Sequence, residues 1–188
     1  MTSAKKEAII RTLLNISAEN GKLTIEEISK RSNIPRSTIN RNFKNGINEM
    51  VETLYLSVVH EINYQLLEYN PLDMTLEIFS DIVLPILWNH RNEAQVLFTS
   101  NLPFQLIKPV SGIVWDWAKE YFENLVQIHG LSPYFSSLEL LQYFNAQLTS
   151  IFILWLGVRI PMEVEVFKQK FLFIMNSSMK NLIYFDIN

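Results

Sequence analysis

Residues 33–43 read NIPRSTINRNF, and this short stretch decides how the first part of the chain folds. Asn33 suits a left-handed turn, because its side chain tolerates that backbone conformation better than most. Pro35 suits the first position of a helix, where its missing backbone N–H is not needed. On a helical wheel Ile39 points to the inner side of this helix, and Phe43 closes a small core. The outer side carries polar and basic side chains: Arg36, Ser37, Asn40 and Arg41.

The sequence before this stretch predicts two further helices. The first is expected near residues 4–19, and Asn20-Gly21 is a good C-terminus for it. Its apolar face is formed by Ile9, Leu13 and Ile16. Thr24 and Glu27 have the spacing of a capping box, in which the hydroxyl accepts from the Glu27 amide and the Glu27 carboxylate reaches back. A second helix would then run to about Arg31, which gives the chain the spacing of a helix-turn-helix.

Residues 9–43 resemble the DNA-binding domain of the TetR family of transcriptional regulators. In that family a glycine ends the first helix, a threonine caps the second, and an Ile-Ala pair, Gly-Val-Ser, Thr-Leu-Tyr and a phenylalanine follow. The matching residues are Gly21, Thr24, Ile28-Ser29, Asn33-Ile34-Pro35, Thr38-Ile39-Asn40 and Phe43. Asn40 and Asn42 stand where the family usually has Tyr and His, and Lys44 is a displaced substitute for the family's lysine at the start of the fourth helix.

The resemblance implies an all-α fold in two parts. Residues 1–47 would form a three-helix helix-turn-helix DNA-binding domain, joined to a C-terminal helical domain for ligand binding and dimerisation over residues 48–188. Apolar spacing independently predicts helices throughout the rest of the chain. After a long helix that ends before Pro71, they are expected near residues 73–89, 91–100, 108–129, 133–157 and 163–184. Pro85 should kink or split the first of these.

The last two predicted helices are strongly apolar. The first has Leu138, Leu141, Asn145, Leu148 and Phe152 on one face, and the second has Val164, Phe167, Phe171, Ile174 and Ser178. By resemblance, two such helices from each subunit would form a four-helix bundle between the subunits of a homodimer. The alternative is that both helices fill the core of one subunit, and periodicity does not separate the two.

Charge is divided unevenly along the chain. Residues 1–48 hold nine Lys or Arg and four Glu, whereas the remaining 140 residues hold seven basic and fifteen acidic groups. A basic module on an acidic body predicts a polyanionic partner at one end. The chain has no cysteine, no secretory signal pattern and no apolar run long enough to cross a bilayer. We therefore expect a cytoplasmic protein without a membrane segment.

The polar helix supplies the types of side chain that read DNA. Arg can pair with guanine and Asn with adenine in the major groove, which assigns Arg36, Ser37, Asn40 and Arg41 to base edges. Thr24, Asn42 and Lys44 are better suited to phosphates. The full set of predicted DNA-binding residues is Thr24, Arg36, Ser37, Thr38, Asn40, Arg41, Asn42 and Lys44. The alternative is an ordinary solvated helix face.

The larger part of the chain is rich in aromatic residues, which could line a pocket for a small apolar effector. The predicted pocket residues are Trp88, Phe98, Trp115, Tyr121, Phe122 and Tyr143. Taken singly, an aromatic residue of this kind is more often a core residue than a ligand contact. No catalytic constellation appears: His60-Glu61 lacks the second His of a zinc helix, and no glycine loop for phosphate is present. We expect no enzyme activity, no cofactor and no metal.

The sequence therefore predicts a homodimeric transcriptional regulator, a repressor, that binds a palindromic operator and is released by a small apolar effector. One alternative is an all-helical ligand-carrier or protein-interaction dimer with a degenerate DNA-binding module, because the family's Tyr, His and Lys are missing. A second alternative is an activator or co-regulator that responds to a protein partner. Neither the operator nor the effector can be read from the sequence.

Overall fold

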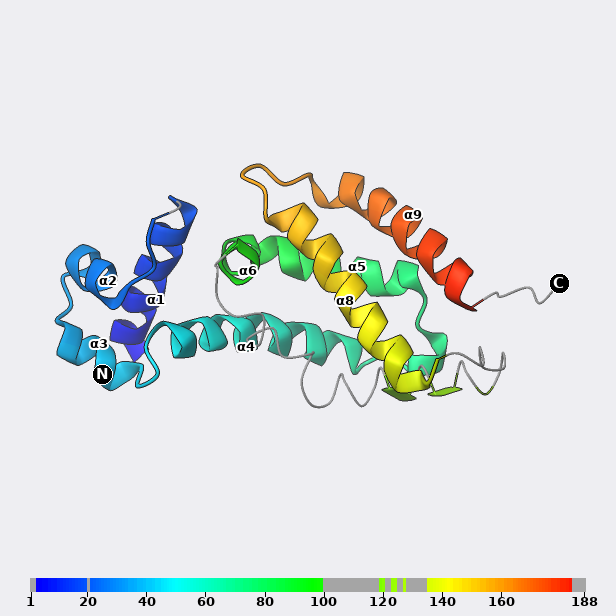
Figure 1. The fold of residues 1–188 in the computed structure, drawn as a ribbon, viewed down its shortest axis with the longest axis horizontal. Coiled ribbons are helices and arrows are strands. Elements are labelled where there is room, and N and C mark those ends of the chain that lie inside the picture. The colour runs from blue at the N-terminus through cyan, green and yellow to red at the C-terminus, as the bar shows by residue number, and fades with distance from the viewer. Residues whose placement is uncertain are drawn as a thin grey trace. The chain divides into compact units, whose positions relative to one another are not determined.

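The protein is described here by a computed structural model. It describes residues 3–19, 21–99 and 135–183, with a few further residues at 119–120, 123–124 and 127. All regular structure in these ranges is helical, which confirms the all-α fold class (Figure 1). In the same ranges, no helix is both long enough and apolar enough to span a bilayer.

The chain divides into two compact units. One comprises Met1–Val58 and His90–Ile107, and the other comprises Val59–Asn89 and Lys108–Asn188. The first unit is larger than the range 1–47 expected from the sequence, because α6 (Arg91–Thr99) packs on α1 (Ser3–Ala18). α4 (Ile47–Leu66) contributes residues to both units.

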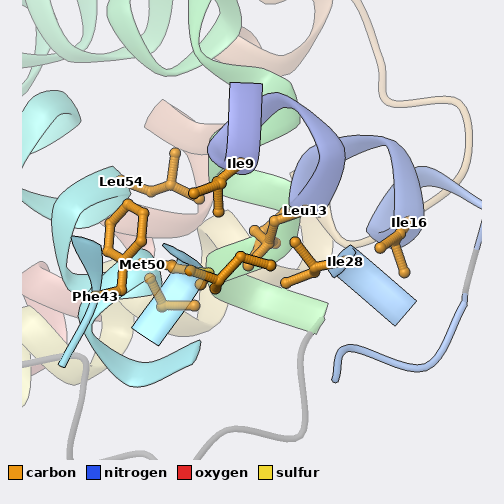
Figure 2. Close-up of a cluster of buried hydrophobic side chains, with 10 residues drawn as sticks. Ile9, Leu13, Ile16, Ile28, Phe43, Met50 and Leu54 are labelled. Carbon is orange, nitrogen blue, oxygen red and sulfur yellow. The ribbon is translucent and has the colours of Figure 1, made fainter. Parts of the chain in front are cut away.

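The core of the first unit joins residues that lie far apart in the sequence (Figure 2). The predicted face of α1 is fully buried in it, which confirms that part of the prediction. The complete cluster consists of Ile9, Leu13, Ile16, Ile28, Ile39, Phe43, Met50, Val51, Leu54 and Val96. The backbone of Gly21 packs tightly against the end of α1, since a Cβ at this position would lie 2.9 Å from Ile16 Cγ2. The glycine that ends the first helix is thus required by packing.

The turn between α2 (Ile25–Ser32) and α3 (Arg36–Asn42) has the predicted left-handed residue: Asn33 has φ 54° and ψ 29°. Two serines fix the turn. The Ser29 hydroxyl donates to the Ile34 carbonyl at 2.8 Å, and the Ile34 amide donates to the Ser32 hydroxyl at 3.2 Å. Pro35 is the N-cap of α3 and not its first helical residue, because its extended ψ of 141° precedes the first helical turn.

The second unit packs α5 (Leu76–Asn89), α8 (Ser137–Leu156) and α9 (Val164–Ile183) around aromatic rings. A short 3-10 helix, Pro71–Asp73, precedes α5. α5 runs alongside α9 (Figure 1), and Lys168 of α9 forms an ion pair with Asp81 of α5. Of the two predicted effects of Pro85, a kink or a split, the split does not occur, since α5 continues through this exposed proline. Most of the helix expected over residues 108–129 lies outside the described residues.

Ring contacts show how α8 and α9 run. Trp155 stacks on Phe167 with centroids 4.1 Å apart, and Phe152 stacks on Phe171 at 6.1 Å. Trp155 lies nearer the C-terminus of α8 than Phe152 does, whereas its partner Phe167 lies nearer the N-terminus of α9 than Phe171 does. The two helices are therefore antiparallel. α8 begins with a complete capping box formed by Ser136 and Glu139, a signal that the sequence contains but that we did not predict.

Candidate nucleic-acid interface

α3 presents the polar face that its sequence predicts. Ile39 is completely buried in the first unit and Phe43 is buried directly after the helix. The four outer side chains are all exposed: Arg36, Ser37, Asn40 and Arg41. We call these four residues the α3 face. Burial on one side fixes the helix in place, so the α3 face is held rigidly toward solvent.

Two of the predicted DNA-binding residues already hold local partners. The Asn42 side-chain amide donates to the Thr38 carbonyl at 2.7 Å, which occupies one of its two N–H donors. Thr38 itself is half-buried, and its hydroxyl lies 3.5 Å from Arg41 Nη2, the limit of a hydrogen bond. Thr38 and Asn42 are therefore arranged to stabilise the end of α3, and they are less available to DNA than the α3 face.

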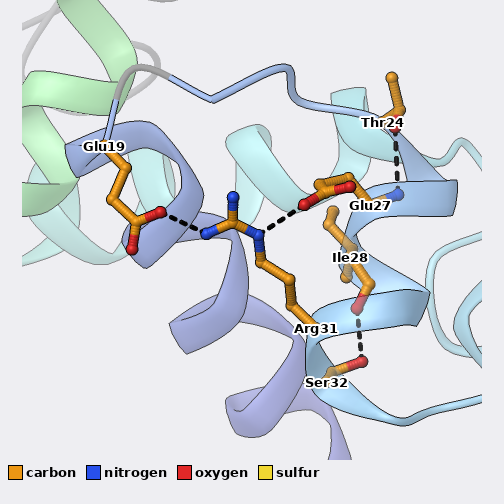
Figure 3. A network of polar contacts seen from close by, with 6 residues as sticks. All are labelled: Glu19, Thr24, Glu27, Ile28, Arg31 and Ser32. Atoms are coloured by element: carbon orange, nitrogen blue, oxygen red, sulfur yellow. Dashed lines mark hydrogen bonds and ion pairs between the residues drawn. The ribbon is translucent and has the colours of Figure 1, made fainter.

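Thr24 is a helix cap, as predicted, but the capping box is incomplete. The Thr24 hydroxyl accepts from the Glu27 amide at 3.1 Å. The Glu27 carboxylate does not return to the cap, because it binds Arg31 Nε at 2.6 Å (Figure 3). The expected reciprocal bond is replaced by an i,i+4 ion pair along α2.

Arg31 pairs with two carboxylates of the first unit. Its Nη1 binds Glu19 Oε2 at 2.5 Å in addition to the Glu27 contact, so one guanidinium joins α2 to the end of α1 (Figure 3). The hydrogen bond from Arg31 lowers the pKa of Glu27, and the bonds from Glu27 and Glu19 raise the pKa of Arg31. Arg31 thus counts toward the basic composition but not toward the charge available for a polyanion.

The other basic side chains near α3 differ in whether they form an ion pair with a carboxylate. Arg36 Nη2 binds Glu26 Oε1 at 2.6 Å. Arg41 and Lys44 are exposed, and neither has an ion-pair partner among the described residues. Lys6 of α1 lies over the Phe43 ring at 5.4 Å, which brings a further positive charge beside the end of α3. Lys6, Arg41 and Lys44 therefore place positive charge near the C-terminal end of α3.

Most of the predicted effector-pocket side chains lie outside the described part of the chain. Trp88 stacks on Trp155, with centroids 6.0 Å apart, and Tyr143 is exposed on α8. Trp115, Tyr121 and Phe122 lie outside the described residues, as does the side chain of Phe98. In the described ranges, no group of three or more His, Asp or Glu side chains could hold a metal ion.

Half of the side chains predicted to form the dimer interface, five of the ten, are buried inside the second unit. Leu141, Leu148, Phe152, Phe167 and Phe171 are buried there, because they pack the three helices of one subunit together. A second set of apolar side chains points to solvent: Leu154, Val166 and Phe173 are exposed together with the predicted Leu138, and Leu154 and Phe173 each have 73% of their surface accessible. If α8 and α9 meet a partner, this second set makes the contact.

Comparison of the chain with known protein families, curated proteins and solved structures finds no match.

Proposed function

We propose that this protein is a DNA-binding transcriptional regulator of the TetR type, a repressor whose α2, turn and α3 form a helix-turn-helix. The observation that carries this proposal is the α3 face. Four polar or basic side chains are exposed on a short helix whose other side is completely buried. An α-helix fits the major groove of duplex DNA, where Arg and Asn have favourable partners on guanine and adenine.

The ion pairs indicate which basic side chains of the first unit are available to contact DNA. Arg41 and Lys44 keep their charge available at the end of α3 and are suited to phosphate oxygens as well as bases. Arg31 is occupied by two carboxylates and is not expected to take part.

A homodimer follows from the way such units read DNA. One short helix reaches only a few base pairs, and two-fold symmetric proteins bind half-sites about 34–36 Å apart. The exposed apolar side chains of α8 and α9 support self-association through the second unit. An apolar effector bound by this unit would release the operator by favouring one arrangement of the dimer.

Selection of bound duplexes from a random DNA pool tests this function. We expect enrichment of a palindrome, with affinity that falls steeply as salt increases, since phosphate contacts release counterions. Arg41→Ala and Lys44→Ala should each reduce the steepness of that dependence. If no sequence is enriched at any salt concentration, the proposal is wrong and the carrier alternative gains support. A thermal-shift screen with apolar compounds tests the effector separately.

A further inference from the structure

Glu26 is an acidic residue placed next to the proposed DNA-reading helix. It is the second residue of α2, and its carboxylate binds the guanidinium of Arg36, the first residue of α3. The ion pair spans the turn between the two helices, and both side chains remain exposed, Arg36 by 58% and Glu26 by 73%. A carboxylate at this place would repel the phosphates of any DNA bound to the α3 face.

The local stability of the fold does not require this pair. Thr24 caps α2 without Glu26, and the Asn33 turn is fixed by Ser29 and Ser32. Among the described residues, Glu26 has no partner other than Arg36. An exposed ion pair contributes little to the free energy of unfolding. A carboxylate in the first turn of α2 is favoured by the helix dipole, but that effect does not require an ion pair with Arg36.

The hydrogen-bonding chemistry of the Glu26–Arg36 ion pair suggests a role for it in DNA recognition. A guanidinium has five N–H donors, and the contact with Glu26 uses an N–H of Nη2. The remaining donors can still pair with the two acceptors of a guanine edge. With its charge balanced and its orientation fixed by Glu26, however, Arg36 attracts phosphates less than Arg41 or Lys44 does.

We propose that Glu26 is a positioning residue that determines specificity: it holds Arg36 for a base edge and suppresses its binding to phosphates. This inference rests on the proposed DNA-binding function. Glu26 lowers the affinity for random DNA more than the affinity for the operator, and so it increases the ratio between them. A merely repulsive carboxylate would lower both affinities by the same factor.

The test compares the full-length wild type with Glu26→Gln on the selected operator and on a random duplex of equal length. We expect random-DNA affinity to rise and the operator-to-random ratio to fall by about fivefold or more, the lower end of the value of one good base contact. The salt dependence on random DNA should steepen by about 0.9 for each phosphate newly bound by Arg36. Thermal unfolding should change only slightly, through the loss of one carboxylate from the first turn of α2.

Two further variants test whether the effect of Glu26→Gln depends on its ion pair with Arg36. Glu68→Gln removes the same charge from an exposed position in the second unit, and its ratio should match the wild type. In an Arg36→Ala background, Glu26→Gln should no longer change the ratio, because the group that Glu26 positions is absent. Persistence of the effect in that background would overturn the proposal.

The outcomes separate this inference from the function it rests on. If the wild type enriches no sequence, the proposed function fails and the role of Glu26 fails with it. If the wild type binds an operator but Glu26→Gln changes both affinities by an equal factor, only the role of Glu26 is wrong.

Discussion

At the scale of single residues, Asn33 shows how one side chain can determine a turn. Its φ of 54° lies in the left-handed region, and it is the only non-glycine residue with positive φ among the described residues. Asparagine tolerates this conformation, whereas a β-branched residue does not. Because α3 begins three residues later, the conformation of Asn33 determines where the α3 face points.

Replacing Asn33 tests this directly. Asn33→Val should lower the free energy of unfolding by about 1–2 kcal/mol, since its Cβ is strained in the left-handed region. Asn33→Gly is the matched control, because glycine adopts positive φ without that strain. Urea unfolding measures both variants. Equal stability of the Val and Gly variants would show that the turn adopts another conformation in solution.

The contact between Glu27 and Arg31 predicts a dependence of stability on pH. Arg31 lowers the pKa of Glu27 below its ordinary value of 4.5 in the folded protein. The folded state therefore binds this proton less readily than the unfolded state, and the stabilisation is present above about pH 4.5 and lost as pH falls through the lower folded pKa. When the pH is lowered from neutral to below about 4.5, the free energy of unfolding should fall less for Glu27→Gln than for the wild type.

Urea unfolding at a series of pH values measures the effect of Glu27. Glu68→Gln serves as the control, because it removes a carboxylate but leaves both contacts of Arg31 intact. Its loss of stability on acidification should match that of the wild type. If Glu27→Gln also follows the wild-type curve, the ion pair seen in the structure does not persist in solution.

At the scale of elements, Phe43 joins α3 to the rest of the first unit. It is buried between α3 and α4 within the core cluster, and Lys6 of α1 covers its ring. Phe43→Ala should lower the free energy of unfolding by about 3–5 kcal/mol, as expected for truncation of a buried aromatic ring. Leu72→Ala, at an exposed apolar position, should change it little. A small effect of Phe43→Ala would mean that the core does not close around this ring.

Some elements could be predicted from the sequence because local spacing determines them. Ile39 on the inner side of α3 and the left-handed Asn33 follow from helical periodicity and from the properties of one side chain. The packing of α6 on α1 could not be predicted, because it joins Val96 to residues more than 80 positions earlier. The ion pair between Arg36 and Glu26 was missed for a related reason: periodicity within a helix does not show which residues meet across a turn.

At the scale of the whole molecule, the apolar residues of α8 and α9 divide into two sets. One set is buried in the second unit, where stacked rings hold α8 and α9 together. The other set is exposed in the isolated chain, and it includes Leu154 and Phe173. Sequence periodicity did not separate the two sets, since both are apolar and both occur at helical spacing. A large contiguous patch of exposed apolar side chains is typical of a surface that binds a protein partner.

The last prediction concerns self-association. Leu154→Glu combined with Phe173→Glu should convert a dimer into a monomer, because two charges per subunit would be buried in an apolar contact. Sedimentation equilibrium measures the change, and circular dichroism should show an unchanged helix content, since both side chains are exposed in the monomer. Leu72→Glu introduces a charge at an exposed apolar position outside α8 and α9 and should leave the dimer intact. A monomeric mutant should also lose its preference for a palindrome over a single half-site. A wild type that is monomeric at all concentrations would contradict both the dimer and the palindromic operator.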